Sequence, residues 1–271
     1  MKPGALLVLA LAGCVTTPPP PACGQVRALD ELNDSFAQVS PWLSADRREL
    51  LYASNGTSVN LAIERATRDS PTGTFGAPMV ILTEGSATFD PAVSADELTV
   101  WYVVGDPQPG GAMWQATRSS KDEPFGGDAA VFPELGNVVH PTLTADQLTI
   151  YYAQQQTDSA FHDIWTATRR STTDPWSNQH AVIAADDLDE DGPSISADGE
   201  TMLFDLNSTG EPSYIAKATR SHGFADATPA TEFDHDSNAN DFLGSLHADG
   251  RTVVFVSDRS GESDDLFIAC E

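Results

Sequence analysis

Residues 41–46, with the sequence Pro-Trp-Leu-Ser-Ala-Asp, decide the fold because they are the first copy of a pattern that returns about every 50 residues. Each copy contains an apolar residue, a hydroxyl or imidazole side chain, Ala and Asp in this order, and an aromatic residue follows six positions after the Asp. A fixed period of this size is the signature of a repeat architecture. The repeated residues are Asp46, Asp96, Asp146, Asp198 and Asp249, with Tyr52, Tyr102, Tyr152, Phe204 and Phe255.

Each repeat predicts four short strands separated by turns. The first strand carries an inward apolar residue and ends at the Ala-Asp turn, and the second is a β-branched and aromatic run such as residues 98–103. The third strand leads to an Ala-Thr-Arg marker, and the fourth is a shorter apolar run such as residues 79–82. The inward residues are Leu43, Val93, Leu143, Ile195 and Leu246, and the markers begin at Ala66, Ala116, Ala167, Ala218 and, loosely, Ala269.

Units of this kind cannot bury enough apolar area alone, and they become stable by packing their faces against one another. The sequence therefore predicts an all-β, five-bladed β-propeller of four-stranded antiparallel blades, with repeats starting near residues 40, 90, 140, 192 and 243. The fifth repeat stops after its third strand, whereas residues 25–32 match the fourth strand of the other repeats. We expect this N-terminal strand to join the last blade and close the ring, which removes exposed sheet edges.

Ring closure would place two cysteines, Cys23 and Cys270, on adjacent strands of the last blade. In an oxidising compartment we expect them to form a disulfide that stabilises the domain by about 4 to 5 kcal/mol. The alternative is a pair of buried free thiols.

The N-terminus has the features of a processing signal. Residues 1–13 combine Lys2 with an apolar run that is too short for a finished membrane span, and they read as a signal peptide. The run ends in Leu-Ala-Gly-Cys14, which resembles the bacterial lipobox and implies lipidation of Cys14; the alternative is an ordinary secretory signal with an incidental cysteine. Residues 14–23 then form the lipidated cysteine and a Pro-rich tether, and residues 24–271 form the propeller. The same resemblance implies, from Val15, an outer-membrane lipoprotein that faces the periplasm or the cell surface.

The charge is strongly acidic, with 40 acidic residues, 14 basic residues and a formal net charge of −26. Such a surface repels phosphate backbones and anionic headgroups, so we expect no nucleic-acid partner and membrane contact only through the lipid anchor. Cations or basic protein surfaces fit better, although the charge is also explained by solubility alone. We expect a monomer whose partners are other envelope proteins.

Two stretches carry a family resemblance. Residues 196–204, Ser-Ala-Asp-Gly-Glu-Thr-Met-Leu-Phe, and residues 248–261 resemble the WD-repeat-like blades of the TolB family, with Ala in place of the family's Pro in four copies. The resemblance covers residues 40–270. It implies a periplasmic protein that acts mainly by binding other proteins or lipoproteins. Five blades instead of six, and no extra N-terminal domain, separate the chain from TolB itself.

Function is expected where the repeats differ. The positions just before the first strand, at the mouth of the channel in related propellers, are Ser40, Asp90, His140, Gly192 and Leu243. Asp90 and His140 are therefore the ligand-binding candidates, with a solvated loop as the alternative. The repeated Asp should cap its turn. The marker arginines should have a structural role, of which pairing with that Asp is one form; they are Arg68, Arg118, Arg169 and Arg220.

One local motif suggests a metal. Asp187, Asp189 and Asp191 form a D-x-D-x-D-G run with Gly192, which gathers hard oxygen ligands as calcium sites require. The alternative is a solvated acidic loop, since no flanking helices are predicted. Calcium is the one cofactor that the sequence suggests.

Motifs for common catalytic chemistries, such as G-x-S-x-G or H-E-x-x-H, are missing from the sequence. The sequence therefore predicts a non-catalytic outer-membrane lipoprotein whose propeller is a protein-binding or scaffolding module. One alternative is a glycosidase-like five-bladed propeller, which needs carboxylates from separate blades converging on the channel. The other is a sensor that binds calcium or a small ligand.

Overall fold

The computed structural model describes eight stretches of the chain: residues 26–56, 60–106, 110–155, 161–185, 187–208, 211–231, 239–261 and 264–270. Regular structure in them is almost entirely β-strand, and the single helix there is a 3₁₀ turn, η1 (Arg220–His222). Within these stretches no helix has the length and apolar character needed to cross a membrane. The predicted lipidation site Cys14 and the tether lie outside the described residues.

The strands are antiparallel and follow the sequence repeats in sets of four. The first repeat forms a sheet of β2 (Gln38–Leu43), β3 (Glu49–Ser54), β4 (Ala62–Thr67) and β5 (Met79–Leu82). The second contains β6 (Thr88–Val93), β7 (Thr99–Asp106), β8 (Gly110–Thr117) and β9 (Gly126–Ala130). The third contains β10 (Val138–Leu143), β11 (Thr149–Gln155), β12 (His162–Thr168) and β13 (Ser177–Ile183). One residue pair, Val138 with Gly111, joins these two repeats into an eight-stranded sheet.

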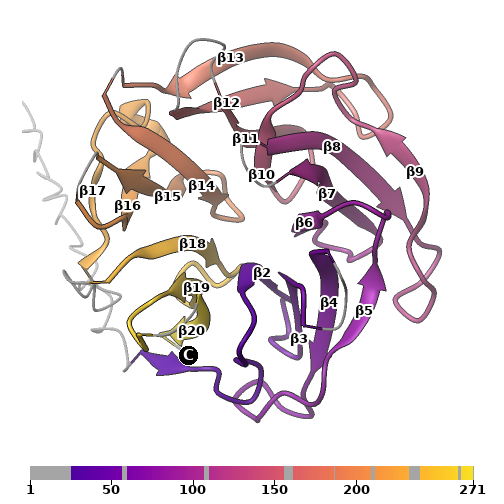
Figure 1. Cartoon of the computed structure of the whole chain (residues 1–271). Helices are drawn as coiled ribbons and strands as arrows, with labels where there is room; N and C mark the ends of the chain where they lie inside the picture. The colour runs from indigo at the N-terminus through magenta and orange to yellow at the C-terminus, as the bar shows by residue number, and fades with distance from the viewer. Residues whose placement is uncertain are drawn as a thin grey trace, which may run out of the picture.

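The fourth repeat contains β14 (Asp189–Ile195), β15 (Thr201–Asn207), β16 (Tyr214–Thr219) and β17 (Thr228–Pro229). The fifth contains β18 (Asp241–Leu246), β19 (Val253–Ser257) and β20 (Asp265–Ala269), and its sheet is completed by β1 (Arg27–Ala28). Figure 1 shows the repeats around a common centre, with β2, β6, β10, β14 and β18 innermost. Each of these inner strands contacts the inner strand of the next repeat, and β18 contacts β2.

The N-terminal segment lies against the last strand, as the sequence predicts. Arg27 is opposite Ile268 and Ala28 is opposite Phe267 in an antiparallel pair. The paired stretch is shorter than expected because the chain turns after Leu29, whose N–H still donates to the carbonyl of Leu266 at 2.9 Å. Cys270 is buried at the end of this sheet, but Cys23 lies outside the described residues, so their disulfide stays a prediction.

The repeated turn holds the ends of the first two strands of each repeat. In four repeats the Ser or Thr hydroxyl donates to the carboxylate of the Asp two residues later, at 2.6 to 2.8 Å. That carboxylate also accepts the backbone N–H of the second residue beyond it, for example from Leu98 to Asp96 at 3.1 Å. The predicted capping role of the Asp is confirmed. Among the residues that the structure describes, the marker arginines do not pair with the turn Asp, which the sequence suggests as one form of their structural role. Instead, Arg68, Arg118 and Arg169 each donate to a backbone carbonyl of the turn.

The core lies between adjacent repeats. The repeated aromatic residues Tyr52, Tyr102, Tyr152, Phe204 and Phe255 are at most 1% exposed, and each packs on the sheet of the preceding repeat. For Tyr52 that preceding sheet is the fifth repeat's, because the ring lies in one cluster with Val254 and Leu266. Buried aromatic side chains of this size contribute about 3 to 5 kcal/mol each. These interfaces hold the inner strands in place around the centre.

Candidate functional site

The positions expected at the channel mouth share an unusual backbone conformation. Ser40, Asp90, His140, Gly192 and Leu243 all have a positive φ, between 52° and 56°. Each stands at a point where the pairing of its inner strand with the next strand shifts register. The left-handed region costs a non-glycine residue about 1 kcal/mol or more, and such strain concentrates at functional sites.

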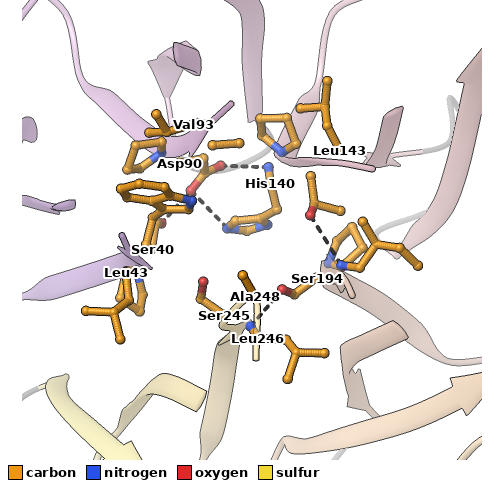
Figure 2. A pocket seen from close by; sticks show the side chains of 18 of the residues that line it. Ser40, Leu43, Asp90, Val93, His140, Leu143, Ser194, Ser245, Leu246 and Ala248 are labelled. Atoms are coloured by element: carbon orange, nitrogen blue, oxygen red, sulfur yellow. Dashed lines mark hydrogen bonds and ion pairs between the residues drawn. The ribbon is translucent and has the colours of Figure 1, made fainter. Parts of the chain in front are cut away.

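These residues line a cavity of about 170 Å³ between the inner strands. The inward apolar residues of the repeats, Leu43, Val93, Leu143, Ile195 and Leu246, form much of its wall. Figure 2 shows Asp90 and His140 pointing toward one another at this cavity, with Ser40 beside them. The cavity is therefore mostly apolar, with a polar cluster on one side.

The structure brings the two ligand-binding candidates, Asp90 and His140, into direct contact. The Nε2 atom of His140 lies 3.1 Å from Oδ1 of Asp90, and the backbone N–H of His140 donates to Oδ2 at 2.8 Å. The hydroxyl of Ser40 donates to Oδ1 of Asp90 at 2.5 Å. Because the three residues come from consecutive repeats, the Asp90 carboxylate ties together β2, β6 and β10.

A second carboxylate, from the fourth repeat, holds the other side of the imidazole. The Nδ1 atom of His140 lies 2.7 Å from Oδ1 of Asp191. Burial favours the neutral imidazole, but the negative charges of Asp90 and Asp191 outweigh it and raise the pKa of His140 well above its usual range. Burial likewise opposes the charge of Asp191, yet His140 lowers the pKa of Asp191 to about 2. The two carboxylates therefore favour the charged form of the imidazole between them.

Next to this cluster, His162 binds Asp189. The backbone N–H of His162 donates to Oδ1 of Asp189 at 2.6 Å, and its Nδ1 atom lies 3.1 Å from the same oxygen and 3.9 Å from Oδ2 of Asp191. Asp189 and Asp191 belong to strand β14, and Asp187 is exposed before it. Within the described ranges no three or more His, Cys, Asp or Glu side chains are placed to hold a metal ion. Calcium therefore stays a prediction, and two of its three carboxylates already have histidine partners.

Sequence reasoning missed the buried Asp205. Its two carboxylate oxygens accept the backbone N–H of Leu243, at 2.9 and 2.8 Å. A Cβ atom at Gly192 would lie 2.3 Å from one of these oxygens, so glycine is required there. Burial, together with the negative charge of Asp191, raises the pKa of Asp205 well above its usual range. The signal was present in the sequence: Asp205 follows the repeated aromatic residue, where the other repeats have Ala53, Val103, Ala153 and Val256.

A second buried acid, Glu190, lies on β14 between Asp189 and Asp191. Burial raises its pKa to about 7, although the backbone N–H of Ala185 donates to it at 3.3 Å. Neither Glu190 nor Asp205 lines the cavity. These two carboxyl groups with raised pKa values therefore lie outside the cavity lining.

Antiparallel four-stranded sheets arranged around a channel define the β-propeller class. The chain has a TolB-like β-propeller fold: it is similar to the putative TolB from Agrobacterium tumefaciens, with 17% identity over 86% of this chain and 76% of that one, at a TM-score of 0.57. TolB from Acinetobacter baumannii is 12% identical over 89% of this chain, at a TM-score of 0.52, and this chain spans only 56% of its length. The endo-arabinase from Bacteroides thetaiotaomicron is 12% identical over 89% of this chain and 96% of the enzyme, at a TM-score of 0.62.

Likenesses at these identities show the fold alone. No protein-family model matches the chain, and no curated protein matches its sequence.

Proposed function

We propose that the chain is a non-catalytic lipoprotein of the cell envelope, in which a closed five-bladed β-propeller binds another protein. Three contacts support closure of the ring. Strand β1 pairs with β20, β18 contacts β2, and Tyr52 packs into the core of the last repeat. The lipobox-like sequence that ends at Cys14 supports the lipid anchor, and the TolB-like fold is compatible with the envelope.

The observation that carries the non-catalytic proposal is the position of His140. A glycosidase needs two carboxyl groups on either side of the bond it cleaves, with room for a sugar and a water or a nucleophile between them. Here the space between Asp90 and Asp191 holds the His140 imidazole, and both carboxylates are bound to it. The cavity of about 170 Å³ is also smaller than the roughly 300 to 1,000 Å³ of typical small-molecule sites. This arrangement fits a rigid binding surface better than a substrate pocket.

The chemistry of the partner follows from charge. A net charge of −26 attracts a basic protein surface and speeds its encounter at low salt. The hydrogen bonds and the ion pair among Ser40, Asp90 and His140 hold these side chains in fixed positions, which lowers the entropic cost of binding there. We therefore place the binding surface at the channel mouth.

The test is affinity capture with residues 24–271 as bait against an envelope extract from the cells that make the protein. The matched bait is the double variant Asp90→Asn, His140→Gln, which keeps the hydrogen-bonding shapes and removes the charges. The proposal expects one protein to be retained by the original bait, released by added salt and by free domain, and retained several-fold less by the variant. Equal retention by both baits would place the partner elsewhere, and no saturable partner would contradict the binding role.

A glycoside hydrolase is the second candidate function. It is favoured by the likeness to the endo-arabinase, whose TM-score of 0.62 exceeds that of the TolB from Agrobacterium tumefaciens. The carboxylate of Asp90 lines the cavity, and that of Asp191 binds His140 beside it. A reducing-sugar assay on arabinan distinguishes the two functions. Release of sugar that is lost in Asp90→Asn supports the enzyme, and no release supports the binding module.

A further inference from the structure

The marker arginines have one arrangement in three repeats. The Nε atoms of Arg68, Arg118 and Arg169 donate to the turn carbonyls at 2.6 to 2.8 Å. Their guanidinium groups lie 4.2 to 4.4 Å from the ring centres of Phe75, Phe125 and Trp176. A cation held by a carbonyl and an aromatic face in this way is part of the scaffold.

The fourth repeat breaks this arrangement. Ala227 occupies the position of the stacking aromatic residue, and the aromatic side chain is moved to Phe224. Phe224 is buried with a left-handed φ of 59°, and its ring meets Tyr151 of the third repeat edge-on at 5.9 Å. A left-handed Phe is strained, and strain of this kind persists where the surrounding structure enforces it. In the described part of the chain, the Arg220 guanidinium has no hydrogen bond or ion pair.

Arg220 lines a groove of about 410 Å³ between the third and fourth repeats. This volume is in the range of small-molecule sites. One wall is the face of β11, β12 and β13, and the other is formed by η1 and the residues after it. Tyr151 is 3% exposed, and its hydroxyl, too, has no hydrogen-bond partner among the described residues. The lining includes Thr149, Tyr151, Thr168, Val182, Arg220 and Phe224.

Two carboxylates that feel the charge of Arg220, those of Asp146 and Glu200, do not bind its side chain. Asp146 and Glu200 both feel its positive charge, which contributes to the lowered pKa of each, after larger effects of hydrogen bonding. Each has its own partners: Asp146 accepts from Thr144 and Leu148, and Glu200 accepts from Ser221. Neither carboxylate therefore occupies the donors of the guanidinium.

We infer that this groove, the Arg220 groove, binds a small organic carboxylate with an apolar ring. The guanidinium offers a planar fork that matches a carboxylate, and the Tyr151 hydroxyl offers a further donor beside it. The rings of Tyr151 and Phe224 and the side chain of Val182 supply the apolar wall. The site is separate from the channel mouth and does not depend on the function proposed for it.

The test is a titration of residues 24–271, labelled with ¹⁵N, with benzoate as the probe and neutral benzamide as its comparison. We expect saturable shifts for Thr149, Tyr151 and Phe224, with a Kd of about 1 mM or below, and much weaker binding of benzamide. Arg220→Gln should weaken benzoate binding about ten-fold or more, because a charge-assisted pair is lost. Tyr151→Phe should weaken it by a smaller factor.

The matched control is Arg170→Gln, which removes an exposed arginine outside the groove. It changes the net charge equally and should leave the Kd unchanged. Three results would overturn the inference: no saturable shift with benzoate, equal binding of benzamide, or equal weakening by Arg170→Gln and Arg220→Gln. The spectrum of each variant reports whether the domain is folded, so loss of the fold is distinguished from loss of the site.

Discussion

Replacing His140 by alanine should destabilise the domain most strongly where the imidazole is charged. The side chain of Asp90 is 1% exposed and that of Asp191 is 21% exposed, so the variant leaves two carboxylates with little solvation and no counter-charge. Removing one partner of a buried ion pair costs about 3 to 5 kcal/mol. Because His140 and Asp191 remain partly accessible, we expect about 3 kcal/mol near pH 6.

The pH dependence gives the sharper test. The pKa of His140 is higher in the folded protein than in the unfolded chain, so its stabilising contribution is complete below its ordinary pKa of 6.5 and decreases as the pH rises through the folded-state value. The pKa of Asp191 is lowered to about 2, so its contribution is present above its ordinary pKa and is lost as the pH falls toward 2. The difference between original and variant should therefore be largest between about pH 4 and 6.5.

The assay is urea unfolding followed by tryptophan fluorescence at pH 3, 5.5 and 9, with His180→Ala as the control. His180 is exposed, and its Nδ1 atom binds the carbonyl of Asn178 and no carboxylate. The control should cost less than about 0.5 kcal/mol at every pH. If His140→Ala lowers the free energy of unfolding equally at all three pH values, or no more than the control does, a charged His140 between Asp90 and Asp191 is refuted.

Three further substitutions test neighbouring parts of the structure. Glu190→Gln should stabilise the domain by about 1 to 3 kcal/mol at pH 8 and by much less at pH 4.5, measured by urea unfolding. The reason is that burial raises the pKa of Glu190 to about 7, so its charged form destabilises the folded protein. An equal gain at both pH values would contradict this. Gly192→Ala should lower the free energy of unfolding by about 2 kcal/mol or more beyond the effect of Gly250→Ala. Both positions have a positive φ, but only a side chain at residue 192 would collide with Asp205. Equal effects would show that the contact with Asp205 does not require glycine at residue 192. His247→Ser introduces the residue that three of the other turns have, but it removes the 3.1 Å contact with the carbonyl of Ser44 between the first and fifth repeats. It should therefore lower the unfolding free energy by about 1 kcal/mol, and no change would argue against this contact.

The repeat architecture was predictable because the fold depends on residues that every copy needs. The Ser-Ala-Asp turn is a local structure, so its hydrogen bonds follow from neighbouring residues such as Ser94 and Asp96. The aromatic residue after it fills one interface between repeats, and its apolar area shows in the sequence as a buried strand. The pairing of β1 with β20 was predictable from a count of strands, because one unit lacked its fourth strand and a spare segment preceded the first.

The candidate site was only half predictable, because its geometry depends on a backbone feature that sequence patterns do not encode. Comparing the repeats selected Asp90 and His140, but a left-handed φ at both positions decides that they meet. The D-x-D-x-D-G run suggests calcium, with a solvated acidic loop as the alternative. In the structure Asp189 and Asp191 lie two residues apart on strand β14 and so project from the same face. From that face they reach His162 and His140. The histidine partners come from other strands, His162 from β12 and His140 from β10, so the spacing of the carboxylates in the sequence could not reveal them.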